Sequence, residues 1–576
     1  MTGGFVREAA FLVLGAALLA QAQAPQQTPV FRSTTTVVPI TVTVLDKKGL
    51  PVTDLKQSDF TVLEDDQPRE IVNFFPQPFA PLPVPPQKPG ALNRAAPAAV
   101  LMPQTRRTFL IVLGYGRIQY PTRAVDGALE FVRKKLLPQD LVAVLAFNRA
   151  TDITTNHEQV ARLLERYRDQ HEKVVFDIDE FRGRVPAGVP IPPLPKWIQD
   201  EIDTIFLGVA PPKDGKPTAA FLAKAEPMRS ATEMLLGMTR VHKLNEAPWQ
   251  QAETFEDVRL RLYRDFNVPL ADAVTLGSLM KVYAGIEYLR FLDGEKHLLF
   301  LGRGLVVEEP GVNPYTWDKQ DEDRLARRAT DGHIVMHMIH TGGPRPGREP
   351  MRTAGLMTQA AEHMTELTGG YFTGLRYASE ALATIDQSTR FSYLLGYSPT
   401  NPVLDGKFRK VVVKVNRPDV TLRFQHGYYA IDEIPAAQLE ELLTSSRTGA
   451  AVGIAQEASS ITVTAATSML PRMGVSLEVQ VDITIDASQL TWAAADGIRT
   501  GQLELQVYAG DAKEHTIGQW NRRLDIKADA ETYDGWLKTG IRQIARVAVP
   551  SKPKFVKVVV YDYGSDRLGS AMVTVK

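Results

Sequence analysis

The chain has 576 residues and equal numbers of basic and acidic side chains, 66 of each, so its formal net charge at pH 7 is zero. This balance argues against the broad positive field that draws a protein to nucleic acid or to an anionic membrane, and we expect no nucleic-acid partner. Cysteine is absent, which excludes disulfides, thiol nucleophiles, cysteine-based metal sites and a lipid-anchoring cysteine.

The N-terminus carries an apolar run of about 12 residues, AAFLVLGAALLA, from Ala9 to Ala20. Such a run is too short to span a bilayer but fits the hydrophobic part of a signal peptide. We predict a signal peptide over 1–22, cleaved after Ala22 because Pro25 disfavours cleavage just before it; an uncleaved membrane anchor is the alternative. No other stretch approaches the roughly 20 apolar residues of a spanning helix. We therefore expect a secreted, periplasmic or cell-envelope protein without a transmembrane anchor once the signal is removed.

Residues 30–75 are predicted to form a small β-domain. Apolar side chains alternate from Val38 to Val44, as in a half-buried strand, and 59–64 and 71–74 supply two more strands. The next segment, 76–105, holds nine of the 39 prolines of the chain. It is predicted to be a Pro-rich, semi-rigid linker.

Residues 106–430 alternate between predicted strands and helices. Apolar-rich runs predict strands at 109–113, 141–147, 297–301, 333–339 and 391–397. Apolar residues at helical spacing predict helices at 124–137, 276–292, 323–329 and 358–367. This alternation is typical of an α/β domain with a parallel sheet and helices on both faces. The stretch 165–275 does not continue this alternation, because it contains a Pro-rich loop and mixed helical segments. We predict a mainly helical insertion there.

The remaining chain is predicted to hold a connector, 431–459, and a β-sandwich domain, 460–576. Short apolar runs with turns between them predict seven strands, at 462–466, 475–485, 502–508, 523–526, 544–549, 555–561 and 571–575. With 44% hydrophobic residues, the chain can bury several cores, and we expect three domains in all.

Four motifs follow one another in the second half of the predicted α/β region. They are LTGGYF at 367–372, FSYLLGYSPT at 391–400, DGKFRK at 405–410 and HGYY at 426–429. In this order they resemble the von Willebrand factor type A (VWFA)-related domain proteins of the acidobacterial type. The resemblance implies a type A-like, Rossmann-like α/β domain with a helical insertion, flanked by an N-terminal β-domain and a C-terminal β-sandwich.

Type A domains that bind ligands through a metal hold Mg²⁺ with oxygen atoms from three loops: a D-x-S-x-S motif after the first strand, a threonine and an aspartate. Here the first loop reads GYGRI, so Gly114 stands at the aspartate position, and Gly116 and Ile118 stand at the serine positions. The third loop places Arg303 where the carboxylate is expected, and only Ser278 matches the threonine. Because Mg²⁺ requires several oxygen ligands in near-octahedral geometry, we predict a degenerate metal-ion-dependent adhesion site with no metal and no cofactor.

The predicted binding surface consists of the residues on these degenerate loops: Gly114, Tyr115, Gly116, Arg117, Ser278 and Arg303. Arg303 at the former metal position would receive a partner carboxylate in a bidentate pair, with Arg117 beside it. The alternative is that Arg303 only hydrogen-bonds loop carbonyls.

Two other residue groups are candidates for chemistry. His333, His337 and His340 would bind zinc only from a helix; on a strand, about 13 Å separates His333 from His337, so strand histidines without a metal are expected. The tyrosines of the family motifs are interpreted as strand-packing rather than sugar-binding residues: Tyr393, Tyr397, Tyr428 and Tyr429.

No catalytic motif stands in a suitable context, so no catalytic residue is assigned. The leading function is non-catalytic protein–protein binding or scaffolding outside the cytoplasm, with a protein partner that the sequence does not name. The alternatives are an exported hydrolase with its site in the insertion and a purely structural envelope protein. A deep cleft would favour the hydrolase, and a flat exposed surface would favour binding.

Overall fold

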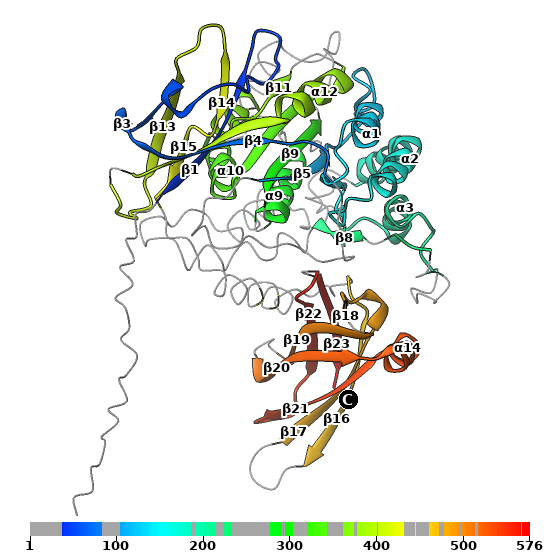
Figure 1. Cartoon of the computed structure of the whole chain (residues 1–576). Helices are drawn as coiled ribbons and strands as arrows, with labels where there is room; N and C mark the ends of the chain where they lie inside the picture. Colours follow the sequence, from blue (N-terminus) through cyan, green and yellow to red (C-terminus); the bar gives the residue numbers. More distant parts are fainter. Residues whose placement is uncertain are drawn as a thin grey trace, which may run out of the picture. The chain divides into compact units, whose positions relative to one another are not determined.

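The computed structural model describes most of the chain (Figure 1). The described residues are 37–82, 104–185, 192–212, 277–302, 319–341, 361–430 and 460–575, with short gaps, and isolated residues between 221 and 231 and at 444 and 448. The predicted signal peptide, most of the predicted connector and Arg303 lie outside them. None of the helices among the described residues combines the length and the hydrophobicity that a membrane span requires.

A seven-stranded sheet has the order β11-β10-β9-β5-β6-β7-β8. Five strands run parallel: β5 (Arg107–Leu113), β6 (Leu141–Ala146), β9 (Glu295–Gly302), β10 (Ile334–His340) and β11 (Phe372–Thr373). Two short strands extend the sheet beyond β6: β7 (Arg149–Thr151), which is antiparallel to β6, and β8 (Met228–Ser230), which is antiparallel to β7.

Helices cover both faces of this sheet (Figure 1). One face packs against α1 (Ala124–Lys134), α2 (His157–Gly183), α3 (Lys196–Leu207) and α12 (Ala378–Ser388). The other face packs against α9 (Ser278–Leu289) and α10 (Lys319–Asp331). Strand β5 is buried along its whole length because its alternate side chains enter the two cores. The chain is therefore a mixed α/β protein, as predicted at this level.

The predicted insertion needs two corrections. Its boundary at 165 falls inside α2, which runs as one helix from His157 to Gly183. It also contributes β8 to the sheet, so its described part is not only helical. A three-residue strand, Met-Arg-Ser, has too few apolar positions to show a period of two.

The strands of the predicted N-terminal β-domain do not form a unit of their own. They pair with strands from 391–429 in two four-stranded sheets, of orders β14-β1-β12-β4 and β15-β13-β2-β3. The early strands are β1 (Val38–Leu45), β2 (Phe60–Glu64), β3 (Gln67–Arg69) and β4 (Ile71–Pro78), with the short 3-10 helix η1 (Gln57–Asp59) before β2. The late strands are β12 (Phe391–Tyr397), β13 (Phe408–Val415), β14 (Thr421–Phe424) and β15 (Gly427–Tyr429).

The boundaries at 75 and 106 are corrected accordingly, because the two sets of strands share one hydrophobic core. Strand β12 is antiparallel to both β1 and β4. The prediction that 391–397 forms a strand of the parallel sheet is therefore wrong about the sheet to which it belongs. Strand β4 also extends to Pro78, into the predicted linker.

The motif tyrosines hold these early and late strands together. The Tyr393 hydroxyl accepts a hydrogen bond from the Leu55 backbone at 3.0 Å. The hydroxyls of Tyr397 and Tyr428 both donate to Glu64 Oε2, at 2.7 and 3.0 Å. Burial, reinforced by Glu64, raises the pKa of both phenols. The interpretation of these tyrosines as packing residues agrees with these contacts.

Residues 460–575 form two further sheets around one core. The first sheet contains β16 (Val463–Pro471), β17 (Leu477–Ile485) and β21 (Ile541–Val549). The second contains β18 (Ala493–Ala495), β19 (Ile498–Gly510), β20 (Thr516–Ala528), β22 (Phe555–Asp562) and β23 (Arg567–Thr574). Each of the seven predicted strands coincides with an observed one. The short 3-10 helix η3 (Ala487–Gln489), β18 and the helix α14 (Ala530–Thr539) were not predicted.

Candidate binding site at the carboxyl edge of the sheet

The order of the parallel strands defines a switch point between β5 and β9. From β5 the chain continues through α1 to β6 on one side, whereas β9 lies on the other side of β5. In open α/β sheets, ligands bind outside the carboxyl ends of the strands at such a point. The loop 114–123 follows β5 at this edge, and the first turn of α9 lies there too, because the Lys281 ammonium is 5.7 Å from the centre of the Tyr115 ring.

Backbone packing explains the glycine at position 114. A Cβ atom on Gly114 would lie only 2.9 Å from the Cα atom of Gly302, where β9 ends. The Gly114 amide donates to the Leu301 carbonyl at 2.8 Å, and the Thr341 amide donates to the Gly302 carbonyl at 2.8 Å. The ends of β5, β9 and β10 are thus joined by backbone contacts, and no room remains for an aspartate side chain at position 114.

The next two loop residues turn the chain away from the sheet. Tyr115 is buried, and its hydroxyl donates to Asp179 Oδ1 of α2 at 2.7 Å. Gly116 has a φ of 90°, a conformation that glycine adopts without steric cost. Arg117 is exposed. The loop therefore buries an aromatic ring and presents a cation to solvent.

Helix α9 brings the other predicted residue to this edge. Ser278 is its first residue and is buried, and Lys281, one turn later, is fully buried. Residues three apart lie on one side of a helix. The structure therefore brings Gly114, Tyr115 and Ser278 to one edge with Lys281, which sequence reasoning missed, and Arg303 lies outside the described residues.

Three exposed residues that were not predicted extend this edge. Tyr120 and Tyr377 are 65% and 57% exposed, and the side chain of Arg123 is 65% exposed. The two tyrosines belong to neighbouring loops, because the Ala378 amide donates to the carbonyl of Thr122 at 3.0 Å. We define the edge patch as four residues: Arg117, Tyr120, Arg123 and Tyr377. The sequence GYGRIQYPTR at 114–123 contains these arginines and Tyr120, but no apolar period in it indicates which of them are exposed.

The backbone beneath the edge patch is held by the Gln119 side chain. Its Oε1 atom accepts a hydrogen bond from the Val125 amide at 3.0 Å, and its Nε2 atom donates to Asp126 Oδ2 at 2.6 Å. Both partners lie in the first turn of α1. The loop that carries Arg117, Tyr120 and Arg123 is therefore fixed to a helix.

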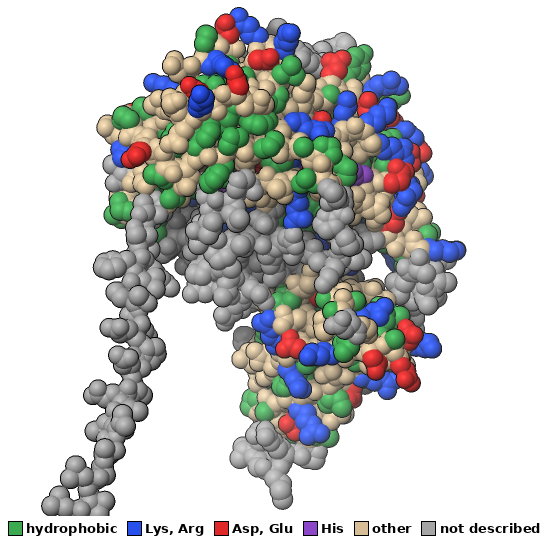
Figure 2. Space-filling model, viewed as in Figure 1, with side chains coloured by type: hydrophobic (Ala, Val, Ile, Leu, Met, Phe, Trp, Pro, Cys, Tyr) green, Lys and Arg blue, Asp and Glu red, His purple; other side chains and the backbone are tan. Residues whose placement is uncertain are grey.

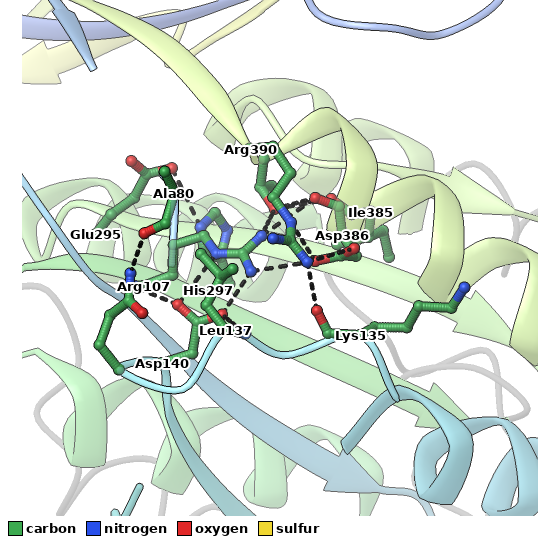
Figure 3. Close-up of polar contacts among 12 residues, drawn as sticks. Ala80, Arg107, Lys135, Leu137, Asp140, Glu295, His297, Ile385, Asp386 and Arg390 are labelled. Atoms are coloured by element: carbon green, nitrogen blue, oxygen red, sulfur yellow. Dashed lines mark hydrogen bonds and ion pairs between the residues drawn. The ribbon is translucent and has the colours of Figure 1, made fainter. Parts of the chain in front are cut away.

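The opposite, amino edge of the sheet carries buried ion pairs (Figure 3). Arg107, at the start of β5, pairs with Asp140 and Asp386 and donates to Thr389 Oγ1 at 2.9 Å. Arg390 also pairs with Asp386, at 2.9 Å. These groups come from β5, the residue before β6 and the end of α12, so the network fastens a helix to two strands.

The histidine group lies on or next to β10. His337 and His340 are within the strand and His333 directly precedes it, as the strand prediction required. His337 is buried, and its Nε2 atom lies 3.1 Å from Nδ1 of His297 on β9. Among the described residues, no group of three or more His, Asp or Glu is arranged to hold a metal ion.

Comparisons with known proteins identify no family. No protein-family model matches the sequence, and no curated protein matches it. One similar solved structure is a beta-glucuronidase of glycoside hydrolase family 2, 10% identical over 20% of this chain and 13% of its own, with a TM-score of 0.14. Another is the alkylpurine DNA glycosylase AlkC of Pseudomonas fluorescens bound to DNA containing an abasic site analog, 9% identical over 73% of this chain and 92% of its own, with a TM-score of 0.15. Scores this low support no inference about fold or function.

Proposed function

We propose that this protein is an exported, non-catalytic binding or scaffold protein built on a VWFA-like α/β domain, and that it engages a protein partner at the carboxyl edge of its seven-stranded sheet without a metal ion. The observation that carries the proposal is the edge patch, which places two exposed tyrosines and two arginines at the switch point. The family motifs support the type A-like origin of the domain.

The donor set at this edge supports binding without metal. The backbone around Gly114 leaves no space for a carboxylate side chain. Gly116, as a glycine, offers no side-chain oxygen to a metal either. Lys281 places a buried ammonium beside Tyr115. A cation at this position repels a divalent metal. The exposed Arg117 and Arg123 of the edge patch favour an acidic partner.

The composition and rigidity of the edge patch support protein binding. Tyrosine and arginine are enriched among the residues that contribute most to protein interfaces. The Gln119 contacts hold the loop in place, which reduces the entropy lost when a partner orders it. Acidic and basic side chains are interspersed on the face shown in Figure 2. This face therefore has no broad field of one sign that would attract a partner by charge alone.

Metal dependence is the first test. Isothermal titration and thermal unfolding of the mature chain with Mg²⁺, Ca²⁺ and Mn²⁺ should show no binding heat and no shift in melting temperature. A clear shift at micromolar metal would overturn the metal-free mechanism.

Partner binding is the second test. Peptide display against the mature chain in the presence of a chelator should select sequences rich in aspartate or glutamate. Binding of the selected peptides should weaken at least tenfold in Arg117→Ala and Tyr120→Ala. Trp197→Ala, which removes an aromatic side chain 50% exposed on α3, is the matched control and should bind normally. Equal loss in all three variants, or loss of binding on chelation, would contradict the proposal.

A further inference from the structure

The sheet of β16, β17 and β21 has one face in the core and one face in solvent. Val479, Val481 and Ile483 of β17 point into the core, and the residues between them point to the other side of the sheet. We define the open face as every second residue of 464–470, 478–484 and 542–548, which lie beside one another in the register of the three strands. All of these residues are at least partly exposed.

The open face carries its charges in two neighbouring rows of opposite sign. Strand β21 contributes Arg542 and Arg546, and strand β17 contributes Glu478 and Asp482. Gln480 lies directly opposite Arg546 and donates to Asp482 Oδ1 at 3.2 Å. Among the described residues, no ion pair joins the two rows or links either row to another element. Both rows are therefore available to charges from another molecule.

The centre of the open face is apolar, and the face has little relief. Ile544, between the two arginines, is 57% exposed. Many of the other positions have short side chains, such as Ala466, Ser468 and Ala548. A second flat surface can therefore approach the sheet closely and cover Ile544.

Strand β20 obstructs the other route by which a sheet gains a partner, the addition of a strand to a free edge. It lies against the edge of β21, where a Cβ atom on Gly518 would be only 2.7 Å from the carbonyl oxygen of Ala548. The accessible part of β21 is thus its outward face.

We propose that the open face joins two copies of this chain in a face-to-face dimer. A two-fold axis that runs parallel to the strands, between β17 and β21, places β17 of each copy over β21 of the other. The acidic row of each copy then faces the basic row of the other, and the two Ile544 side chains meet beside the axis. An axis across the strands would place each row over its own copy, with like charges together. This inference concerns residues 460–575 and does not depend on the edge patch.

The size of the open face determines the expected strength of the dimer. Each of the three strands has nine residues, which gives a face of about 30 by 14 Å and roughly 400 Å² per copy. Two such faces bury about 800 Å², less than the roughly 1,200 Å² of a stable interface. The dimer is therefore weak and reversible, and the charge rows set its orientation.

Sedimentation equilibrium of the full mature chain tests the dimer. The wild type should change reversibly from monomer to dimer as its concentration rises from micromolar toward millimolar. The dissociation constant should increase at least threefold at high salt, because salt screens the exposed charges. A wild type that stays monomeric over the whole range would overturn the proposal.

Charge reversal tests whether these two rows form the contact. Arg542→Glu with Arg546→Glu makes both rows acidic, and Glu478→Arg with Asp482→Arg makes both rows basic. Each double variant alone should be monomeric, with a dissociation constant at least tenfold above that of the wild type. An equimolar mixture of the two should form a heterodimer, and a chain with all four changes should dimerise again. Loss of folding cannot produce this recovery.

Arg522→Glu with Lys527→Glu is the matched control, because it reverses two exposed cations on β20, outside the open face. This variant should dimerise like the wild type. A dimer that persists in both double variants of the open face, or a mixture of those variants that does not associate, would refute the arrangement.

Discussion

The two edges of the seven-stranded sheet use charge in opposite ways. At the amino edge, Arg107 is fully buried and bonds to Asp140, Asp386 and Thr389. At the carboxyl edge, Arg117 and Arg123 lie at the surface beside exposed aromatic rings. Arginine side chains thus stabilise the fold at the amino edge and are accessible to a partner at the carboxyl edge.

Burial separates structural from functional charges in this chain. A buried guanidinium must be paired, because an unpaired charge in the interior is costly. An exposed arginine on a fixed loop contributes little to stability and lies where a partner can reach it. Substitutions at the amino edge should therefore affect folding, and those in the edge patch should affect binding.

Arg107→Ala should give the largest loss of stability. It leaves Asp140 buried without its counter-charge and Asp386 paired with Arg390 alone, and breaking a buried pair in this way costs about 3–5 kcal/mol. Chemical denaturation measures the effect. Arg133→Ala, at an exposed arginine that pairs with Glu158 and Glu165, should lose little, and less at high salt. A similar loss in both variants would show that the buried network has no special role.

Gly114→Ala should have the next largest effect, at the carboxyl edge. The added Cβ would press on the Gly302 Cα atom at 2.9 Å, and such overpacking costs about 1–3 kcal/mol. Gly183→Ala, where the added atom meets nothing within 4 Å, is the control. If thermal unfolding finds Gly114→Ala as stable as the control, the strand ends are not packed as described.

Acid should destabilise the fold through His337. Its pKa in the folded state lies well below the ordinary value of 6.5, so the unfolded chain binds the proton more readily. The stability is complete above pH 6.5 and falls as the pH drops below that value, by at most about 1.4 kcal/mol per pH unit for one group. Denaturation at several pH values should show a smaller slope for His337→Gln, and an identical slope would contradict this assignment.

The edge patch should show the smallest effect on stability. Arg117→Ala and Tyr120→Ala alter exposed side chains, and such changes usually stay within about 0.5 kcal/mol. Differential scanning calorimetry should find nearly unchanged melting temperatures, while peptide binding falls. A large drop in melting temperature would mean that Arg117 and Tyr120 stabilise the fold.

Sequence patterns predicted the individual strands and helices whose side chains repeat with a regular period. The strand at 109–113 and the helix at 124–137 were visible because burial on both faces and helical spacing leave apolar patterns. Arg107 and Asp386 were not visible as partners, since 279 residues separate them and no periodicity records such a contact.

The candidate site was predicted in part for the same reason. Gly114 and Ser278 were found as positions in a family pattern, and the structure places both at the carboxyl edge of the sheet. Lys281 and Tyr377 were missed, because their relation to the loop 114–123 exists only in three dimensions. The sequence explained Gly114 only as the loss of a metal ligand. The structure adds a steric reason, because a side chain at position 114 would press against the backbone of Gly302.

The pairing of β1 with β12 and β14 sets the order in which the chain can complete its fold. Val42 lies opposite both Tyr393 and Phe424, so a ribosome makes the first strand long before its neighbours exist. Closing a loop of this length is slow, and an unpaired strand edge is prone to aggregation in the interval. Strand β1 is therefore among the last elements to complete its native pairing, and its apolar side chains wait unpaired until residues 391–424 have been made.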